Sequence, residues 1–224
     1  MKIFHTRILQ NLTVELCVLS VFFLIIHSAH GQDSLISVAL NAKKSIVRVQ
    51  GQAPNYESQG AGAILSAEGF IITNFHIIKN CDQILITLNN DKKYYAKLVD
   101  IQPQSDLALI KIDAGQPLTP LHLSTPKSFN ASDDVVNIGY SDLLNGTISS
   151  GHIIGTATSI SDNKEIAMLE ISIELHQGDS GGPLLDRNGN LIGIVIAQIS
   201  SDPTRPTLAI AANKIKKIYG EYSK

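Results

Sequence analysis

The sequence predicts an all-β fold: two six-stranded antiparallel β-barrels, with a short helix before the first and another after the second. Short apolar runs recur from about residue 45 to about 211 and are separated by turn residues, which is typical of antiparallel barrels. A proline-bearing stretch divides these runs into two groups of about six. Helical spacing is confined to the flanking segments 34–44 and 213–222.

The N-terminal segment 1–31 has the features of a signal peptide. A weakly basic start precedes an apolar run at 16–26, and small residues follow at 28–31. The run is shorter than the roughly 20 apolar residues of a membrane span. We therefore expect cleavage after Gly31, an exported chain that begins at Gln32, and a periplasmic or secreted location. Contact with a membrane is expected only if the segment is retained as an anchor.

The domain itself is expected to occupy 32–224, with the first barrel at about 45–113. A helix capped by Asp33 leads into this barrel. Turn residues Ala67-Glu68-Gly69 predict a hairpin between its second and third strands. The expected strands are 45–50, 61–66, 70–74, 83–88, 94–100 and 107–112.

A connector is predicted at about 114–127, where three prolines interrupt any regular element. The second barrel should follow at about 128–211 and the closing helix at about 213–222. The apolar runs of this second group are 134–138, 146–154, 157–161, 166–173, 183–186, 191–199 and 207–211.

Composition excludes several classes of function. A net charge of −2 gives no basic face, so nucleic acid is not an expected partner. Removal of the signal segment would also remove Cys17 and leave Cys81 alone, which excludes an internal disulfide. No metal site is expected, because His122, His152 and His176 lack metal-ligand spacing and no Cys/His cluster occurs. No cofactor is expected either.

The segment Gly178-Asp179-Ser180-Gly181-Gly182-Pro183 is the sharpest chemical signal. A serine hydroxyl becomes a nucleophile when a base removes its proton, and the resulting oxyanion needs donors already in place. Glycine before the serine lets successive amides turn toward one point. We therefore expect an oxyanion hole at Gly178, Asp179 and Ser180, with the amides of Gly178 and Ser180 as donors. A plain glycine-rich turn is the structural alternative.

The order of residues along the chain selects among serine hydrolases. The motif also fits the G-x-S-x-G elbow of α/β-hydrolases, which need a histidine after the serine, but His176 is the last histidine. The subtilisin order needs an aspartate before the histidine, and upstream of His76 only Asp33 is available. The order His, Asp, Ser remains.

His76 and Asp106 are the expected partners of Ser180. His76 directly follows the apolar strand 70–74, where a side chain can be held at a barrel end. Asp106 opens the strand 107–112 and can orient the imidazole. The rival carboxylates, which we interpret as solvated turn or strand-end residues, are Asp82, Asp91, Asp100 and Asp113.

The chain resembles the HtrA-type (Deg) trypsin-like peptidases in three motifs. They are Thr73-Asn74-Phe75-His76-Ile77-Ile78, Ser105-Asp106-Leu107-Ala108-Leu109-Ile110 and Gly178-Asp179-Ser180-Gly181-Gly182-Pro183-Leu184. The resemblance implies a serine endopeptidase that cleaves exported or misfolded proteins or peptides. It also implies a homotrimer. A non-catalytic binding or chaperone module with the protease fold is the alternative.

Two departures from this family stand out. HtrA-type proteins commonly carry PDZ domains after the protease, whereas this chain ends about forty residues after Ser180, so we expect it to lack one. The family usually has Asn where Asp179 stands; in trypsin this Asp pairs with a new N-terminal ammonium. No Ile-Val-Gly-Gly start exists here. Asp179 should therefore have another partner.

Glu174 is the candidate for the substrate pocket. In trypsin-like enzymes the residue six positions before the nucleophile forms the pocket floor, and an acid there favours Lys or Arg substrates. Glu174 also alternates with Ile173 and Leu175, as on the solvated face of a strand. HtrA-type enzymes tend to accept small aliphatic residues, so both specificities stay open.

Overall fold

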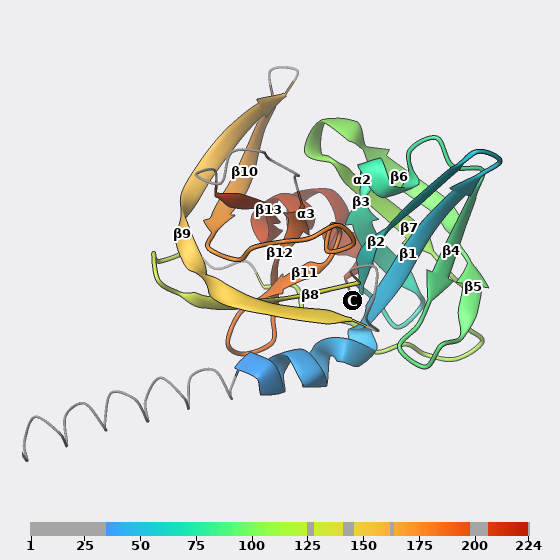
Figure 1. The fold of residues 1–224 in the computed structure, drawn as a ribbon, viewed down its shortest axis with the longest axis horizontal. Coiled ribbons are helices and arrows are strands. Elements are labelled where there is room, and N and C mark those ends of the chain that lie inside the picture. The colour runs from blue at the N-terminus through green and yellow to red at the C-terminus, as the bar shows by residue number, and fades with distance from the viewer. Residues whose placement is uncertain (1–34, 125–127, 141–145, 162–163, 198–205, 224) are drawn as a thin grey trace, which may run out of the picture.

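The computed structural model describes residues 35–124, 128–140, 146–161, 164–197 and 206–223 (Figure 1). The predicted signal peptide and its cleavage site lie outside these residues. A helix over 35–42 opens the described chain and runs into the 3₁₀ turn η1 (Lys43–Ser45). The predicted N-terminal helix is thus present, one turn before the first strand.

The first β unit is a curled seven-stranded antiparallel sheet in the order β5-β4-β1-β2-β3-β7-β6. It differs from the predicted six-stranded barrel because the run 94–100 is two strands, broken where the Ala96 N–H bonds to the Ile84 carbonyl at 2.8 Å. The outer strands β5 and β6 are the edges of this order, so the sheet is a half-barrel. Its strands are β1 (Ile46–Ala53), β2 (Tyr56–Ile64), β3 (Phe70–Asn74), β4 (Gln83–Thr87), β5 (Lys93–Tyr95), β6 (Lys97–Gln102) and β7 (Leu107–Lys111).

The second β unit is a closed six-stranded antiparallel barrel, as predicted, in the order β10-β13-β12-β11-β8-β9. The predicted runs 146–154 and 157–161 are one strand, which forms a long hairpin with β10 that projects from the barrel (Figure 1). The strands are β8 (Asp134–Gly139), β9 (Thr147–Ser161), β10 (Lys164–Ile171), β11 (Pro183–Leu185), β12 (Leu191–Ile196) and β13 (Thr207–Ala211).

Apolar packing forms three clusters. One fills the curl of the first sheet and contains Val49 and Ile110. Another lies in the barrel and contains Leu184 and Val195. The largest cluster joins the two units, because it combines residues such as Ile72 of the sheet with others from the barrel and both terminal helices. This shared core, which we call the seam, brings the ends of the two units together.

The predicted closing helix is α3 (Ala212–Tyr219), followed by the 3₁₀ turn η3 (Gly220–Tyr222). Ala212, Ile215 and Tyr219 are buried on its inner side. It packs behind β12 and β13, against the seam (Figure 1). None of the helices in the described part of the chain has the length and apolar character that a membrane crossing requires.

Candidate active site

His76 and Asp106 come together because β3 pairs with β7 at Asn74 and Leu107. His76 lies in the short helix α2 (Phe75–Ile78), which begins immediately after β3. The Phe75 N–H donates to the Asp106 carbonyl at 3.1 Å, and the Asn74 side-chain amide donates to the same carbonyl at 3.0 Å. The backbone of one residue is therefore fixed against the start of the helix that carries the other.

The Asp106 carboxylate holds His76 at two points. Asp106 follows η2 (Pro103–Ser105) with φ 49° and ψ 40°, a left-handed conformation that turns its side chain toward α2. Its Oδ1 accepts the His76 backbone N–H at 2.9 Å, and its Oδ2 lies 2.7 Å from His76 Nδ1. An ionised carboxylate only accepts, so in this contact it selects the neutral imidazole tautomer that has the proton on Nδ1 and the lone pair on Nε2. The His76 side chain is 45% exposed.

Ser180 lies in the turn before β11 and is attached to both β units. Its carbonyl accepts the Ala61 N–H of β2 at 2.8 Å, and the following residue, Gly181, donates to the Val195 carbonyl of β12 at 3.1 Å. The Ser180 hydroxyl accepts the Ala197 N–H at 3.1 Å. Among the described residues no hydrogen bond joins it to His76. The hydroxyl thus rests against the end of β12.

Gly60 is the point at which the segments of His76 and Ser180 approach each other. A Cβ at Gly60 would lie 2.4 Å from Cδ1 of Ile77, the neighbour of His76, and 2.7 Å from the Ser180 carbonyl oxygen. Both distances are far below normal contact, so only glycine permits this approach. The structure therefore brings the segment that carries His76 against the segment that carries Ser180 at Gly60.

The turn at 176–180 presents backbone amides beside the Ser180 hydroxyl. Gly178 has φ +98°, a conformation that suits glycine, and its carbonyl is held by the Tyr140 N–H at 3.0 Å. The Asp179 N–H donates to the His176 carbonyl at 3.0 Å, so it is already used. In the described chain, the N–H groups of Gly178 and Ser180 have no acceptor.

Asp179 is fully buried and has two hydrogen-bond donors. Its Oδ1 accepts the Thr147 hydroxyl at 2.6 Å, and its Oδ2 accepts the His176 N–H at 2.8 Å. The His176 ring nitrogen Nδ1 lies 4.0 Å from Oδ2. These groups are the partners that the sequence analysis required for Asp179. Thr147 was not foreseen, because it lies 32 positions away on β9 and no local pattern marks it.

Burial in the same region raises the pKa of the Tyr140 phenol, and this effect outweighs the opposing charge of Arg48. The Arg48 guanidinium lies 5.3 Å from the centre of the Tyr140 ring. The Gln59 side-chain amide donates to the Tyr140 carbonyl at 3.0 Å. Tyr140 is therefore a fixed support for the carbonyl of Gly178.

Glu174 is exposed and follows the end of β10, outside any strand. Its side chain lines none of the hollows described here. Within the described residues, no group of three or more His, Cys, Asp or Glu side chains is placed to hold a metal ion.

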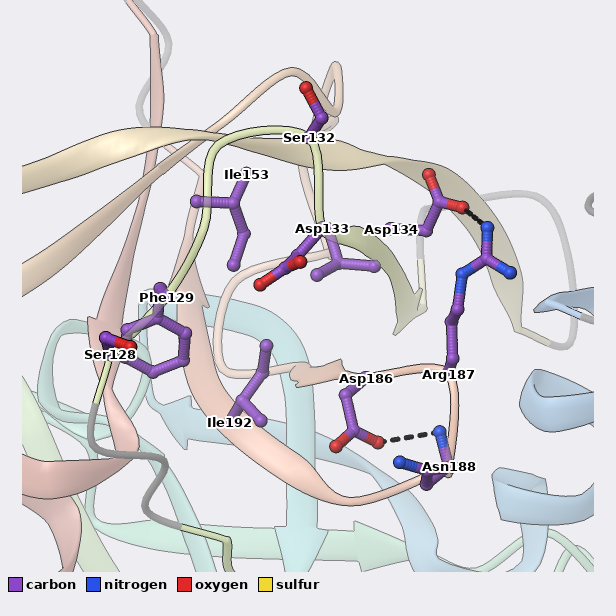
Figure 2. Close-up of a pocket in the computed structure, with 11 residues that line it drawn as sticks. Ser128, Phe129, Ser132, Asp133, Asp134, Ile153, Asp186, Arg187, Asn188 and Ile192 are labelled. Atoms are coloured by element: carbon purple, nitrogen blue, oxygen red, sulfur yellow. Dashed lines mark hydrogen bonds and ion pairs between the residues drawn. The ribbon is translucent and has the colours of Figure 1, made fainter.

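Figure 2 shows a hollow of about 270 Å³ on the barrel, between the segment before β8 and the turn after β11. Its acidic residues are engaged locally: Asp134 pairs with Arg187, and Asp186 accepts the Asn188 N–H at 2.8 Å. Phe129 and Ile192 form part of its apolar lining. None of the three candidate triad residues lines it, so this hollow is separate from the site around Ser180.

The fold and this grouping of side chains define the class. Residues 60–194 match the family of trypsin-like peptidase domains, and the chain belongs to this family. It is 35% identical over 138 residues to the probable periplasmic serine endoprotease DegP-like of Pseudomonas fluorescens, an alignment that covers 62% of this chain and 29% of that protein. It is 31% identical over 173 residues to the periplasmic serine endoprotease DegP of Escherichia coli, covering 75% of this chain and 36% of the relative.

A mammalian relative shows the same extent of similarity. Serine protease HTR4 of Rattus norvegicus is 31% identical over 172 residues, 74% of this chain and 34% of that protein. The alignments thus span about a third of the length of these relatives. The resemblance to HtrA-type peptidases seen in the sequence motifs is confirmed.

Proposed function

We propose that this protein is a serine endopeptidase in which His76, Asp106 and Ser180 form the catalytic triad. The observation that supports this most is the His76–Asp106 contact of 2.7 Å, which orients the imidazole as the general base of the proposed triad. Family membership and the names of the relatives agree with it.

The proposed reaction is acyl transfer. Ser180 Oγ attacks the carbonyl carbon of a peptide bond while His76 Nε2 takes the hydroxyl proton, and Asp106 stabilises the imidazolium that forms. His76 then gives this proton to the departing amine. Water, activated by the same base, hydrolyses the acyl-enzyme and regenerates the hydroxyl. The reaction requires Ser180 Oγ to rotate from the Ala197 amide toward His76.

The unused N–H groups of Gly178 and Ser180 are the proposed oxyanion donors. In this assignment Asp179 supplies no amide, since its N–H is bonded to His176; its buried carboxylate supports the turn instead. Each donor should contribute roughly 10² to 10³ in rate.

The proposed substrates are exported or misfolded proteins, and the proposed location is outside the cytoplasm. The signal-peptide features of the sequence at 1–31 support this location, as does the word periplasmic in the names of bacterial relatives.

Covalent labelling tests the proposal. The protein is treated with a fluorophosphonate, and the modified residue is located by mass spectrometry, with the Ser180→Ala variant as the matched control. We expect an adduct on Ser180 that the variant lacks. Absence of an adduct in a protein shown to be folded by circular dichroism would contradict the proposal and favour a non-catalytic binding module with the protease fold.

A further inference from the structure

A second pocket, of about 300 Å³, lies on the barrel. Its walls come from the β9–β10 hairpin, from β12 and β13, and from the segment between β10 and Ser180. Met168, Leu175, Ile196 and Leu208 supply apolar wall, and Glu170 is the charged residue among the lining side chains. The pocket lies at the lower end of the size range of small-ligand sites, roughly 300 to 1,000 Å³.

Two residues that line this pocket are followed in the chain by residues that hold the segment around Ser180. Ile196 immediately precedes Ala197, whose N–H donates to the Ser180 hydroxyl at 3.1 Å. Leu175 immediately precedes His176, whose carbonyl and N–H hold Asp179. Both segments that position the serine thus continue into the wall of the pocket.

Glu170 occupies the centre of one wall by strand pairing. It is the partner of Leu208 across β13, and Leu208 is in turn the partner of Ile196 across β12. On its other side Glu170 faces Gly155 of β9. A Cβ at Gly155 would lie 3.1 Å from Glu170 Oε2, so the carboxylate extends over the space that this glycine leaves open.

The Glu170 carboxylate differs from the carboxylates of Figure 2, which have local partners. It is half-buried, and among the described residues no cation or hydrogen-bond donor is paired with it. A partly buried carboxylate with apolar neighbours favours a group that combines a long apolar stem with a cationic end. Lysine and arginine side chains have this form.

We propose that this pocket receives the side chain of the residue whose carbonyl Ser180 attacks, and that Glu170 selects lysine or arginine there. The inference rests on the proposed peptidase function and names its substrate class. It assigns to Glu170 the role that the sequence analysis considered for Glu174, which is exposed and does not line this pocket.

Matched peptides test the specificity. Internally quenched substrates are compared that differ only at the residue before the cleaved bond, which is Lys, Arg, Gln or Val. We expect kcat/KM for the Lys and Arg peptides to exceed that for the Gln peptide by about tenfold or more, because only the cations pair with Glu170. In Glu170→Gln this preference should disappear while the Val peptide changes less than about twofold. Glu174→Gln, the matched control, should keep it.

A binding measurement tests the role of Glu170 without requiring catalysis. The fluorescent cation p-aminobenzamidine is titrated into the Ser180→Ala variant, with and without Glu170→Gln or Glu174→Gln. Affinity should fall about tenfold or more with Glu170→Gln alone. Equal affinity in all three proteins, or a loss caused by Glu174→Gln instead, would overturn the assignment. Absence of a fluorophosphonate adduct would contradict the proposed peptidase function. Binding of the amidine to the Ser180→Ala variant does not depend on catalysis, so it tests the role of Glu170 separately.

Discussion

The Asp106 carboxylate uses both of its oxygens on one residue, since Oδ1 accepts the His76 backbone N–H and Oδ2 contacts the ring. An amide at this position has one oxygen and one NH₂ group. It can therefore satisfy only one of these donors, and its NH₂ favours the imidazole tautomer with the proton on Nε2. That tautomer cannot take the Ser180 proton.

Asp106→Asn should consequently lower kcat by about 10⁴ without a comparable loss of stability. The measurement is peptide hydrolysis together with thermal unfolding. Asp113→Asn is the matched control, because Asp113 is an exposed rival whose carboxylate accepts the nearby Gly115 N–H. An Asp106→Asn enzyme with wild-type kcat would remove Asp106 from the triad.

The Thr147 hydroxyl stabilises the buried Asp179 carboxylate. Its bond of 2.6 Å supplies one of the two hydrogen-bond donors to the fully buried Asp179 carboxylate. Thr147→Val keeps the shape and removes the donor, so we expect the free energy of unfolding to fall by about 1 to 3 kcal/mol. Fluorophosphonate labelling of Ser180 should slow as well, because Asp179 supports the oxyanion turn.

Urea unfolding and the labelling rate measure both effects of Thr147→Val. Thr147→Ser retains the hydroxyl and should stay near wild type in both. If Val and Ser variants label equally fast, Thr147 has no part in positioning the turn.

At the scale of elements, short apolar runs predicted most of the strands. The length of each strand in the structure follows its hydrogen bonds to neighbouring strands. The run 70–74 is β3 as predicted. The run 94–100 is split because its first part, up to Ala96, pairs with β4 and its second part pairs with β7. The stretch around Gly155 suggested a break, yet β9 continues through it because β10 pairs with β9 from Ile153 to Ser161. Pairing between strands determined these outcomes, and single-strand patterns do not contain it.

The site was predictable to the extent that its residues lie in local motifs. His76, Asp106 and Ser180 each stand in a recognisable segment, and the structure brings those segments together, although their catalytic role stays a prediction. His76 follows the strand 70–74 as predicted, but the short helix α2 that carries it was not foreseen. The contacts of Thr147 and Ala197 depend on tertiary packing across 32 and 17 positions, and no local signal records them.

The closing helix α3 allows a packing test. Ile215 is fully buried in the seam, so Ile215→Ala should reduce the free energy of unfolding by about 2 to 5 kcal/mol through lost burial and a residual cavity. Lys217→Ala on the exposed side of the same helix is the control and should have little effect. Equal unfolding midpoints in urea for the two variants would show that α3 is not part of the cooperative core.

At the scale of the whole molecule, two buried phenols connect stability to alkaline pH. Burial raises the pKa of Tyr219, with a further rise from the nearby Asp100 charge, and burial also raises the pKa of Tyr140. The unfolded chain releases these protons near the ordinary value of 10.0, before the folded chain does. The stabilisation is therefore fully present below pH 10 and is lost as the pH rises above it.

We expect the free energy of unfolding to fall above pH 10 by up to about 1.4 kcal/mol per pH unit for each of these phenols. Urea unfolding at a series of pH values measures this slope. Tyr219→Phe should reduce this slope by the contribution of one phenol. Tyr95→Phe, at a residue that is 66% exposed, should leave the slope unchanged. A slope that does not change in Tyr219→Phe would assign the alkaline loss to other groups.

The hydrogen bond from Ala61 to the Ser180 carbonyl spans the seam at the nucleophile itself. Under the proposed mechanism the base belongs to one β unit and the nucleophile to the other, so the distance that catalysis depends on is a distance between two halves of the molecule. A substitution that shifts the position of one β unit relative to the other should therefore lower the reaction rate even where it changes the free energy of unfolding little. The rate of peptide hydrolysis would then report on packing far from the reacting atoms.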